Sequence, residues 1–193
     1  MVFTRPKDYD TADVLPESGG RPRLPKGGYV CRILSVSEET SKNNNEMLIF
    51  SLDIAEGEYM GFYAEDYTNQ TGNKRWKFNY RLMIPNDKSK PYTIRLFKTF
   101  NAYCEDSNPG WHFDWTKDEK QYRGQLIGVL VNEREYKTSD GKRGMATNIA
   151  RIVKANTIRS GAYTLPNDQM LKEEPQSDFY MPDNVDDDDL PFN

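Results

Sequence analysis

Apolar and polar residues alternate along five stretches of this chain, which is the pattern of β-strands that bury one face. In the third stretch the even positions from Trp76 to Ile84 are all apolar or aromatic, while the odd positions include Arg, Lys and Asn. The fourth stretch is continuously apolar, which is typical of a strand buried on both faces. The pattern predicts five strands: Gly28–Val36, Met47–Ile54, Lys74–Ile84, Leu126–Val131 and Ala146–Val153.

One helical pattern lies between the third and fourth predicted strands. From Thr93 to Glu105 the apolar side chains lie on one half of a helical wheel and the charged side chains on the other. The stretch Gly57–Asn73 is predicted to be a long polar and aromatic connection, and Asp140-Gly141 suits a tight turn between the last two strands. We therefore predict a mainly β fold, a five-stranded OB-fold barrel with one α-helix between strands 3 and 4. A small β-sandwich is the alternative.

The two ends of the chain lack the apolar pattern of a core. Residues 1–26 are polar and rich in proline and glycine, so we expect a flexible N-terminal arm. Residues 166–193 hold nine acidic residues and one lysine, a charge of −8, so a total of −4 leaves +4 for the rest of the chain. A strongly acidic end on a mildly basic body is typical of a disordered tail that serves interactions. The predicted body is residues 27–165.

Composition excludes several functional classes. No apolar run reaches membrane-spanning length, and the first ten residues lack the apolar core of a signal peptide. Two cysteines, Cys31 and Cys104, and one histidine, His112, are too few for a disulfide framework or a Cys/His zinc cluster. The chain has no phosphate-binding GxxxxGK[ST] loop and no convergent carboxylates. We therefore expect no enzymatic activity, no cofactor and no metal.

The third predicted strand combines cations, which neutralise phosphates, with aromatic faces, on which bases stack. Arg75, Lys77 and Arg81 alternate with aromatic residues. Because neighbouring side chains of a strand point to opposite faces, two arrangements are open. Either the aromatic face is core and the cations contact phosphates, or Trp76 and Phe78 stack bases near a curled strand end. The candidate DNA-binding residues of this strand are Arg75, Trp76, Lys77, Phe78 and Arg81.

The turn between the last two strands is the second candidate. OB folds use this loop to close over a bound strand, whereas the alternative is a solvated turn whose charges contact nothing. Trp111 and Trp115 are instead expected to seal one end of the barrel. The candidate DNA-binding residues here are Arg134, Tyr136, Lys137, Lys142 and Arg143, with Arg151 and Lys154 extending the basic stripe along the last strand.

The last residues join a charged run to an apolar tip. Proline biases Leu190 toward extended geometry, so the tip would lose little entropy on docking into an apolar pocket. The segment resembles the acidic C-terminal peptide of bacterial-type single-stranded DNA-binding proteins, in which Asp-rich residues precede Ile/Leu-Pro-Phe. In that family phenylalanine is the last residue, whereas here Asn193 follows. The resemblance implies that replication, recombination and repair enzymes bind Asp186, Asp187, Asp188, Asp189, Leu190, Pro191 and Phe192.

The body also resembles a known group, the single-stranded DNA-binding proteins of phages and prophages, over roughly Leu24 to Pro166. The resemblance is carried by LPKGGYVCRIL, MLIFSLDIAEGEYMGFY, SNPGWHFDW and EREYKTSDGKRG. It implies that residues 27–165 form an OB-fold domain that coats single-stranded DNA, without sequence preference, in phage replication or recombination. It also implies a location in the cytoplasm of an infected bacterial host, no membrane partner, and partners among replication and recombination proteins. A homo-oligomer stays open.

Other functions fit parts of the sequence. A protein-interaction adaptor or DNA mimic would use the acidic tail and have no nucleic-acid binding of its own. A nuclease is disfavoured by the scarcity of histidine and of clustered carboxylates. For a DNA-binding protein we expect the tail to compete with DNA, because a flexible chain of its length spans roughly 30 Å and reaches the basic body.

Overall fold

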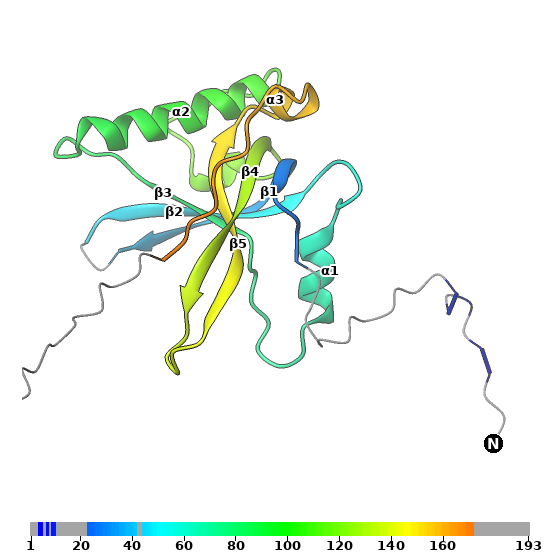
Figure 1. Ribbon diagram of the computed structural model, residues 1–193. Coiled ribbons are helices and arrows are strands. Elements are labelled where there is room, and N and C mark those ends of the chain that lie inside the picture. Colours follow the sequence, from blue (N-terminus) through cyan, green and yellow to red (C-terminus); the bar gives the residue numbers. More distant parts are fainter. Residues whose placement is uncertain (1–3, 6, 8, 11–22, 42–43, 172–193) are drawn as a thin grey trace, which may run out of the picture.

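The five predicted strands form one antiparallel sheet in the computed structural model, which describes residues 4, 5, 7, 9, 10, 23–41 and 44–171. The sheet order is β3-β2-β1-β4-β5 (Figure 1). The mainly β class is therefore confirmed, and in the described part of the chain the strands do not divide into the two sheets of a sandwich. The strands are β1 (Gly27–Thr40), β2 (Glu46–Ile54), β3 (Asn79–Met83), β4 (Leu126–Lys137) and β5 (Arg143–Val153).

The long strand β1 joins the two halves of the sheet. Its first residues pair with β4, from Gly27 opposite Val131 to Arg32 opposite Leu126. Its later residues pair with β2, and the register shifts between Ile33 and Ser35. Such a bulge bends a strand and increases its twist, which lets one strand serve both neighbours.

The third predicted strand is shorter than expected. Pairing with β2 covers only Asn79–Met83, so the prediction of a strand from Lys74 was wrong for its first five residues. The Gln70 side-chain amide explains the difference, because it accepts a hydrogen bond from Arg75 N (2.8 Å) and donates one to Arg75 O (3.0 Å). These bonds occupy the backbone groups that a strand would offer to its neighbour.

The helices include the expected one and others that the pattern did not predict. Helix α2 (Pro91–Ser107) lies between β3 and β4, as predicted, and crosses one end of the sheet (Figure 1). The stretch predicted as a connection contains α1 (Phe62–Asn69), and α3 (Ala155–Arg159) follows β5. A short 3-10 helix, η1 (Glu119–Tyr122), precedes β4. None of the described helices is long and apolar enough to cross a membrane.

The sheet is open between its two edge strands. Strand β3 pairs with β2 and strand β5 with β4, and within the described residues no ladder joins β3 to β5. We call the gap between β3 and β5 the seam. Aromatic side chains fill its inner side: the Tyr63 ring of α1 stacks on Phe78 at 4.3 Å, with an interplanar angle of 7°. Tyr63 also lines one groove together with Thr147 of β5, on the other side of the seam. Side chains thus lie between the two edges where backbone pairing is absent.

An aromatic cluster packs α2 against the sheet. Phe50 of β2 is fully buried, with its ring 4.5 Å from Phe100 and 5.2 Å from Tyr122. Trp111 packs on Tyr122 at 5.5 Å, in agreement with a role at the end of the core, whereas Trp115 is 68 % exposed.

We predict that Phe50→Ala lowers the free energy of unfolding by about 3–5 kcal/mol, because it opens a cavity between the sheet and α2. The exposed Tyr92 is the matched control, and Tyr92→Ala should stay within about 0.5 kcal/mol of the parent. Urea unfolding followed by circular dichroism measures both. Equal midpoints for the two variants would contradict the packing described here.

Candidate nucleic-acid interface

The β4–β5 hairpin extends from one end of the sheet (Figure 1). Its residues include four of the predicted cations and one tyrosine. Thr138 N donates to Lys142 O at 2.8 Å, and Gly141 has the positive φ of 83° that glycine adopts without strain. The turn predicted at Asp140-Gly141 is therefore confirmed. All five predicted hairpin residues are exposed: Arg134, Tyr136, Lys137, Lys142 and Arg143.

The Tyr136 ring occupies space that is free because the residue opposite it on β5, Gly144, has no side chain. Its partner across the hairpin is Gly144, and a Cβ added there would lie 2.8 Å from the Tyr136 ring. The ring therefore lies over the backbone of Gly144 and still is 42 % exposed. A ring supported on one side and open on the other offers a face on which a base can stack.

A groove of about 300 Å³ lies at the open seam, between α1 and the hairpin. Two residues predicted from different strands, Lys77 and Tyr136, line it together. Tyr63 and Thr147, which lie at the seam, contribute to its lining, and Arg23 adds a further cation. The structure thus joins the two predicted regions, the segment before β3 and the hairpin, in one concave surface.

Cations outnumber carboxylates on this surface, and several of them are paired. Arg134 and Lys137 form no ion pair with another residue in the described ranges. Lys142 and Asp140 are both exposed, and an exposed ion pair contributes at most about 1 kcal/mol, so a phosphate can replace this carboxylate. The paired cations are 2.9–3.6 Å from their carboxylates: Arg23 with Glu133, Lys77 with Asp66, Lys142 with Asp140 and Arg143 with Glu135.

The two aromatic candidates of the third predicted strand face inward. Phe78 is 2 % exposed and belongs to the core, so the structure follows the core alternative for this residue. Trp76 packs against the core, and its indole N–H donates to Leu52 O at 2.9 Å. We therefore leave both rings out of the stacking surface.

The remaining predicted cations lie outside the groove lining. Arg75 and Arg81 are exposed on the segment before β3 and on β3 itself. Arg151 and Lys154 lie toward the opposite end of β5 from the hairpin, and at about 3.4 Å per residue Lys154 is roughly 35 Å from Arg143. Lys154 forms an ion pair with Asp106 at the end of α2, at 2.5 Å. These residues do not converge with Lys77 and Tyr136.

Helix α1, which forms one wall of the groove, is held by a buried carboxylate. Asp53 of β2 is 5 % exposed. Its Oδ1 accepts from Tyr63 N at 3.0 Å and its Oδ2 accepts from Ala64 N at 3.2 Å. These are amides of the first turn, which have no partner within a helix. Asp53 therefore fixes the position of α1 and, with it, of Tyr63.

Sequence reasoning missed Arg23, Asp53, Tyr63 and Thr147. Arg23 lies in the predicted arm, although the neighbouring Leu24 is 3 % exposed and belongs to the core. The sequence offers one indication of α1, the absence of proline and glycine from the eight residues Phe62–Asn69. This segment is too short and too weakly amphipathic for a helix to be predicted from it. The links to Asp53 and Thr147 are tertiary contacts that no local pattern carries.

The chain beyond the predicted body follows β4 toward the hairpin. Gln169 N donates to Glu133 O and Glu135 N donates to Gln169 O, both at 2.8 Å, in a parallel bridge beside Arg134. Lys26 Nζ donates to Asp168 at 2.7 Å, and this hydrogen bond lowers the pKa of the Asp168 carboxyl. The predicted partner-binding residues, Asp186 to Phe192, lie outside the described residues.

A scan against protein-family models finds no matching family, and a search of curated proteins finds no match either. Among the described residues no group of three or more His, Cys, Asp or Glu side chains could hold a metal ion.

We predict that Asp53→Asn weakens the attachment of α1, because one carboxylate oxygen that accepts a backbone hydrogen bond is replaced by an amide NH₂ group. The loss of hydrogen bonds to a charged group should cost about 1–3 kcal/mol. Hydrogen exchange of the Tyr63 and Ala64 amides should speed up relative to the parent. The exposed Asp87 provides the control variant Asp87→Asn, and an unchanged exchange rate in Asp53→Asn would show that this carboxylate does not hold α1.

Proposed function

We propose that this chain is a sequence-nonspecific single-stranded DNA-binding protein that coats single strands in phage replication and recombination. The observation that carries the proposal is the seam groove, where the Tyr136 ring, supported by Gly144, shares one concave surface with Lys77. A stacked base and a neutralised phosphate are the two contacts that a sequence-tolerant binder needs. The resemblance of the body to phage and prophage single-stranded DNA-binding proteins supports the same function.

We also propose that the sheet belongs to the OB-fold class. The order β3-β2-β1-β4-β5 is that of a five-stranded barrel opened between β3 and β5, and α2 follows the third strand, as the OB plan requires. OB folds bind oligonucleotides with strands 2 and 3 and with the loop between strands 4 and 5. The groove lies between the segment that precedes β3 and the β4–β5 hairpin, which supports this assignment.

The groove favours unpaired over paired nucleic acid. A base in a duplex is stacked on both sides and offers no face to Tyr136, whereas an unpaired base does. Every base has a face, so stacking does not depend on sequence. The acidic end of the chain would then recruit replication, recombination and repair enzymes through Leu190 to Phe192, as its resemblance to the bacterial-type C-terminal peptide implies.

The proposal predicts binding to oligo-dT that exceeds binding to a duplex of equal length. The logarithm of the association constant should decrease with the logarithm of salt concentration, with a slope of about −0.7 for each phosphate contacted. Fluorescence anisotropy of labelled oligonucleotides measures both quantities on the full chain. Equal affinity for the duplex, or no affinity at low salt, would overturn the proposal and favour the adaptor or DNA mimic.

A second prediction concerns the stacking platform. Tyr136→Ala should weaken oligo-dT binding by about 1–3 kcal/mol, the usual contribution of one stacked base. Gly144→Ala should weaken it in the same direction, because the new methyl group displaces the Tyr136 ring while the ring can move without unfolding the hairpin. Tyr92→Ala removes a more exposed tyrosine from α2 (66 % against 42 % for Tyr136) and serves as the control. If Tyr136→Ala and Tyr92→Ala bind oligo-dT equally well, Tyr136 is not a stacking residue.

A further inference from the structure

A second groove, remote from the hairpin, runs along α2. Its volume is about 390 Å³. Ile94, Phe97 and Ala102 of α2 form one wall, Phe113 and Trp115 of the loop before η1 form the other, and Pro85 adds to the lining. The proposed DNA-binding surface uses none of these residues.

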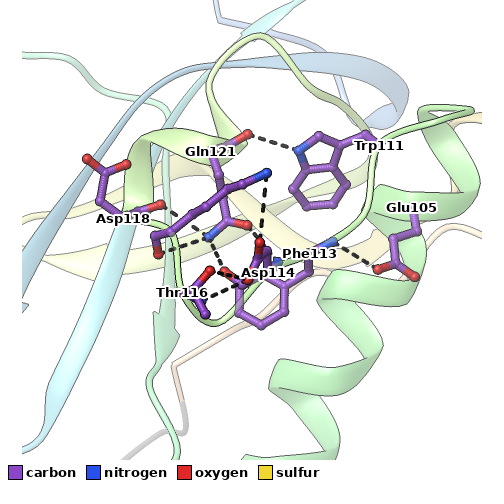
Figure 2. Close-up of polar contacts among 8 residues, drawn as sticks. Glu105, Trp111, Phe113, Asp114, Thr116, Asp118 and Gln121 are labelled. Carbon is purple, nitrogen blue, oxygen red and sulfur yellow. Dashed lines mark hydrogen bonds and ion pairs between the residues drawn. The ribbon is translucent and has the colours of Figure 1, made fainter.

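The loop wall of this groove is rigid although Trp115 is 68 % exposed. The Trp115 ring stacks on Phe97 at 5.4 Å and meets the edge of Phe113 at 4.9 Å. Figure 2 shows the polar contacts that hold the loop, with the side chain of Gln121 at their centre. Gln121 accepts from Asp114 N (2.9 Å) and donates to Asp114 O (3.0 Å), while Glu105 accepts from Phe113 N (3.0 Å).

A preformed apolar groove beside a helix suits an extended apolar peptide. The lining residues of α2 extend from Ile94 to Glu105, which is about 16 Å at 1.5 Å per residue. Three extended residues span roughly 10 Å, so a tripeptide fits along the groove. Because the two walls are already fixed, docking would not have to order them.

The chain carries such a tripeptide at its own end. Leu190-Pro191-Phe192 places two apolar side chains on either side of a proline that favours extended geometry. Residues 172–189 separate it from Leu171, the last described residue, and a stretch of that length reaches up to about 60 Å. Attachment to the same chain makes docking intramolecular, at an effective concentration of up to about the millimolar range.

Charge at the groove also suits this occupant. Lys98 and Glu105 line the groove, and Glu105 is occupied by Phe113 N. Arg95 lies one residue from Ile94 on the same helix, so two cations stand against one carboxylate. Both cationic side chains are exposed, and neither forms an ion pair with another residue of the described ranges. The four aspartates 186–189 immediately precede Leu190, so they would approach these cations when the tip enters the groove.

We propose that the groove along α2, and not the basic surface on which the tail was expected to compete with DNA, is the docking site for the chain's own tip, Leu190 to Phe192. The docked tip is withheld from other proteins, so a recruited enzyme must compete with the groove for it. The docking itself does not depend on nucleic-acid binding, and its test contains no DNA.

The test places a photoreactive group at the tip of the full chain, as Phe192→p-benzoylphenylalanine. After irradiation at micromolar protein concentration, mass spectrometry should locate cross-links on residues 94–102 and 113–115 of the same molecule. The same group at Tyr180 is the positional control and should not give this pattern. Cross-links that concentrate on residues 134–147, that join two chains, or that do not form at all would each overturn the proposal.

A matched pair of variants tests the groove itself. Ala102→Glu puts a charge into the apolar groove from an exposed helix position, and the cross-link yield should decrease about tenfold or more. Ala64→Glu makes the same change at an exposed position of α1 and should leave the yield unchanged.

A second measurement avoids the photoreactive group. The combined Leu190→Ser and Phe192→Ser variant should speed hydrogen exchange in the loop 111–117, because the docked tip shields that loop. An unchanged exchange rate would also overturn the proposal.

Discussion

The contact between Tyr63 and the two edges of the sheet is the constraint on which the candidate site depends. In the described residues β3 and β5 form no ladder with each other, so backbone hydrogen bonds do not close the sheet. Tyr63 stacks on Phe78 on one side of the seam and lines the groove with Thr147 on the other. Burial raises the pKa of its hydroxyl, which keeps this group neutral. Tyr63 thereby fills the core side of the seam, while a groove remains on its outer side.

Under the proposed function, few residues would be needed to hold a single strand. Asp53 fixes α1, α1 positions Tyr63, and the groove above Tyr63 brings Lys77 close to Tyr136. Gly144 supports the Tyr136 ring, so the ring does not lose freedom on binding. In the proposed complex, the hairpin cations Arg134, Lys137 and Lys142 would contact phosphates without breaking an ion pair to a buried carboxylate. Stacking and charge then act on one surface, and the groove along α2 is left for a different occupant.

The strands and α2 could be predicted because the apolar residues repeat every 2 residues in a strand and every 3.6 in a helix. Such repeats can be read from neighbouring residues of the sequence alone. It failed where a side chain from elsewhere decides the structure. The alternation from Lys74 to Phe78 is that of a strand, yet Gln70 captures the backbone of Arg75 and the segment leaves the sheet. Of the candidate site residues, Lys77 and Tyr136 line one groove, while Lys154 pairs with Asp106 at the other end of β5. Tyr63 could not be found, because its role comes from contacts across the seam.

The most direct test of the central claim is to map where a single strand touches the full chain. Oligo-dT that carries 5-iodouracil at single positions is cross-linked to the protein by light, and the modified residues are identified by mass spectrometry. The account predicts cross-links at Tyr136 and in the neighbouring hairpin residues 134–147, and none with a matched duplex. Cross-links confined to Trp115 or Tyr92 beside α2, or equal yields from the duplex, would contradict it.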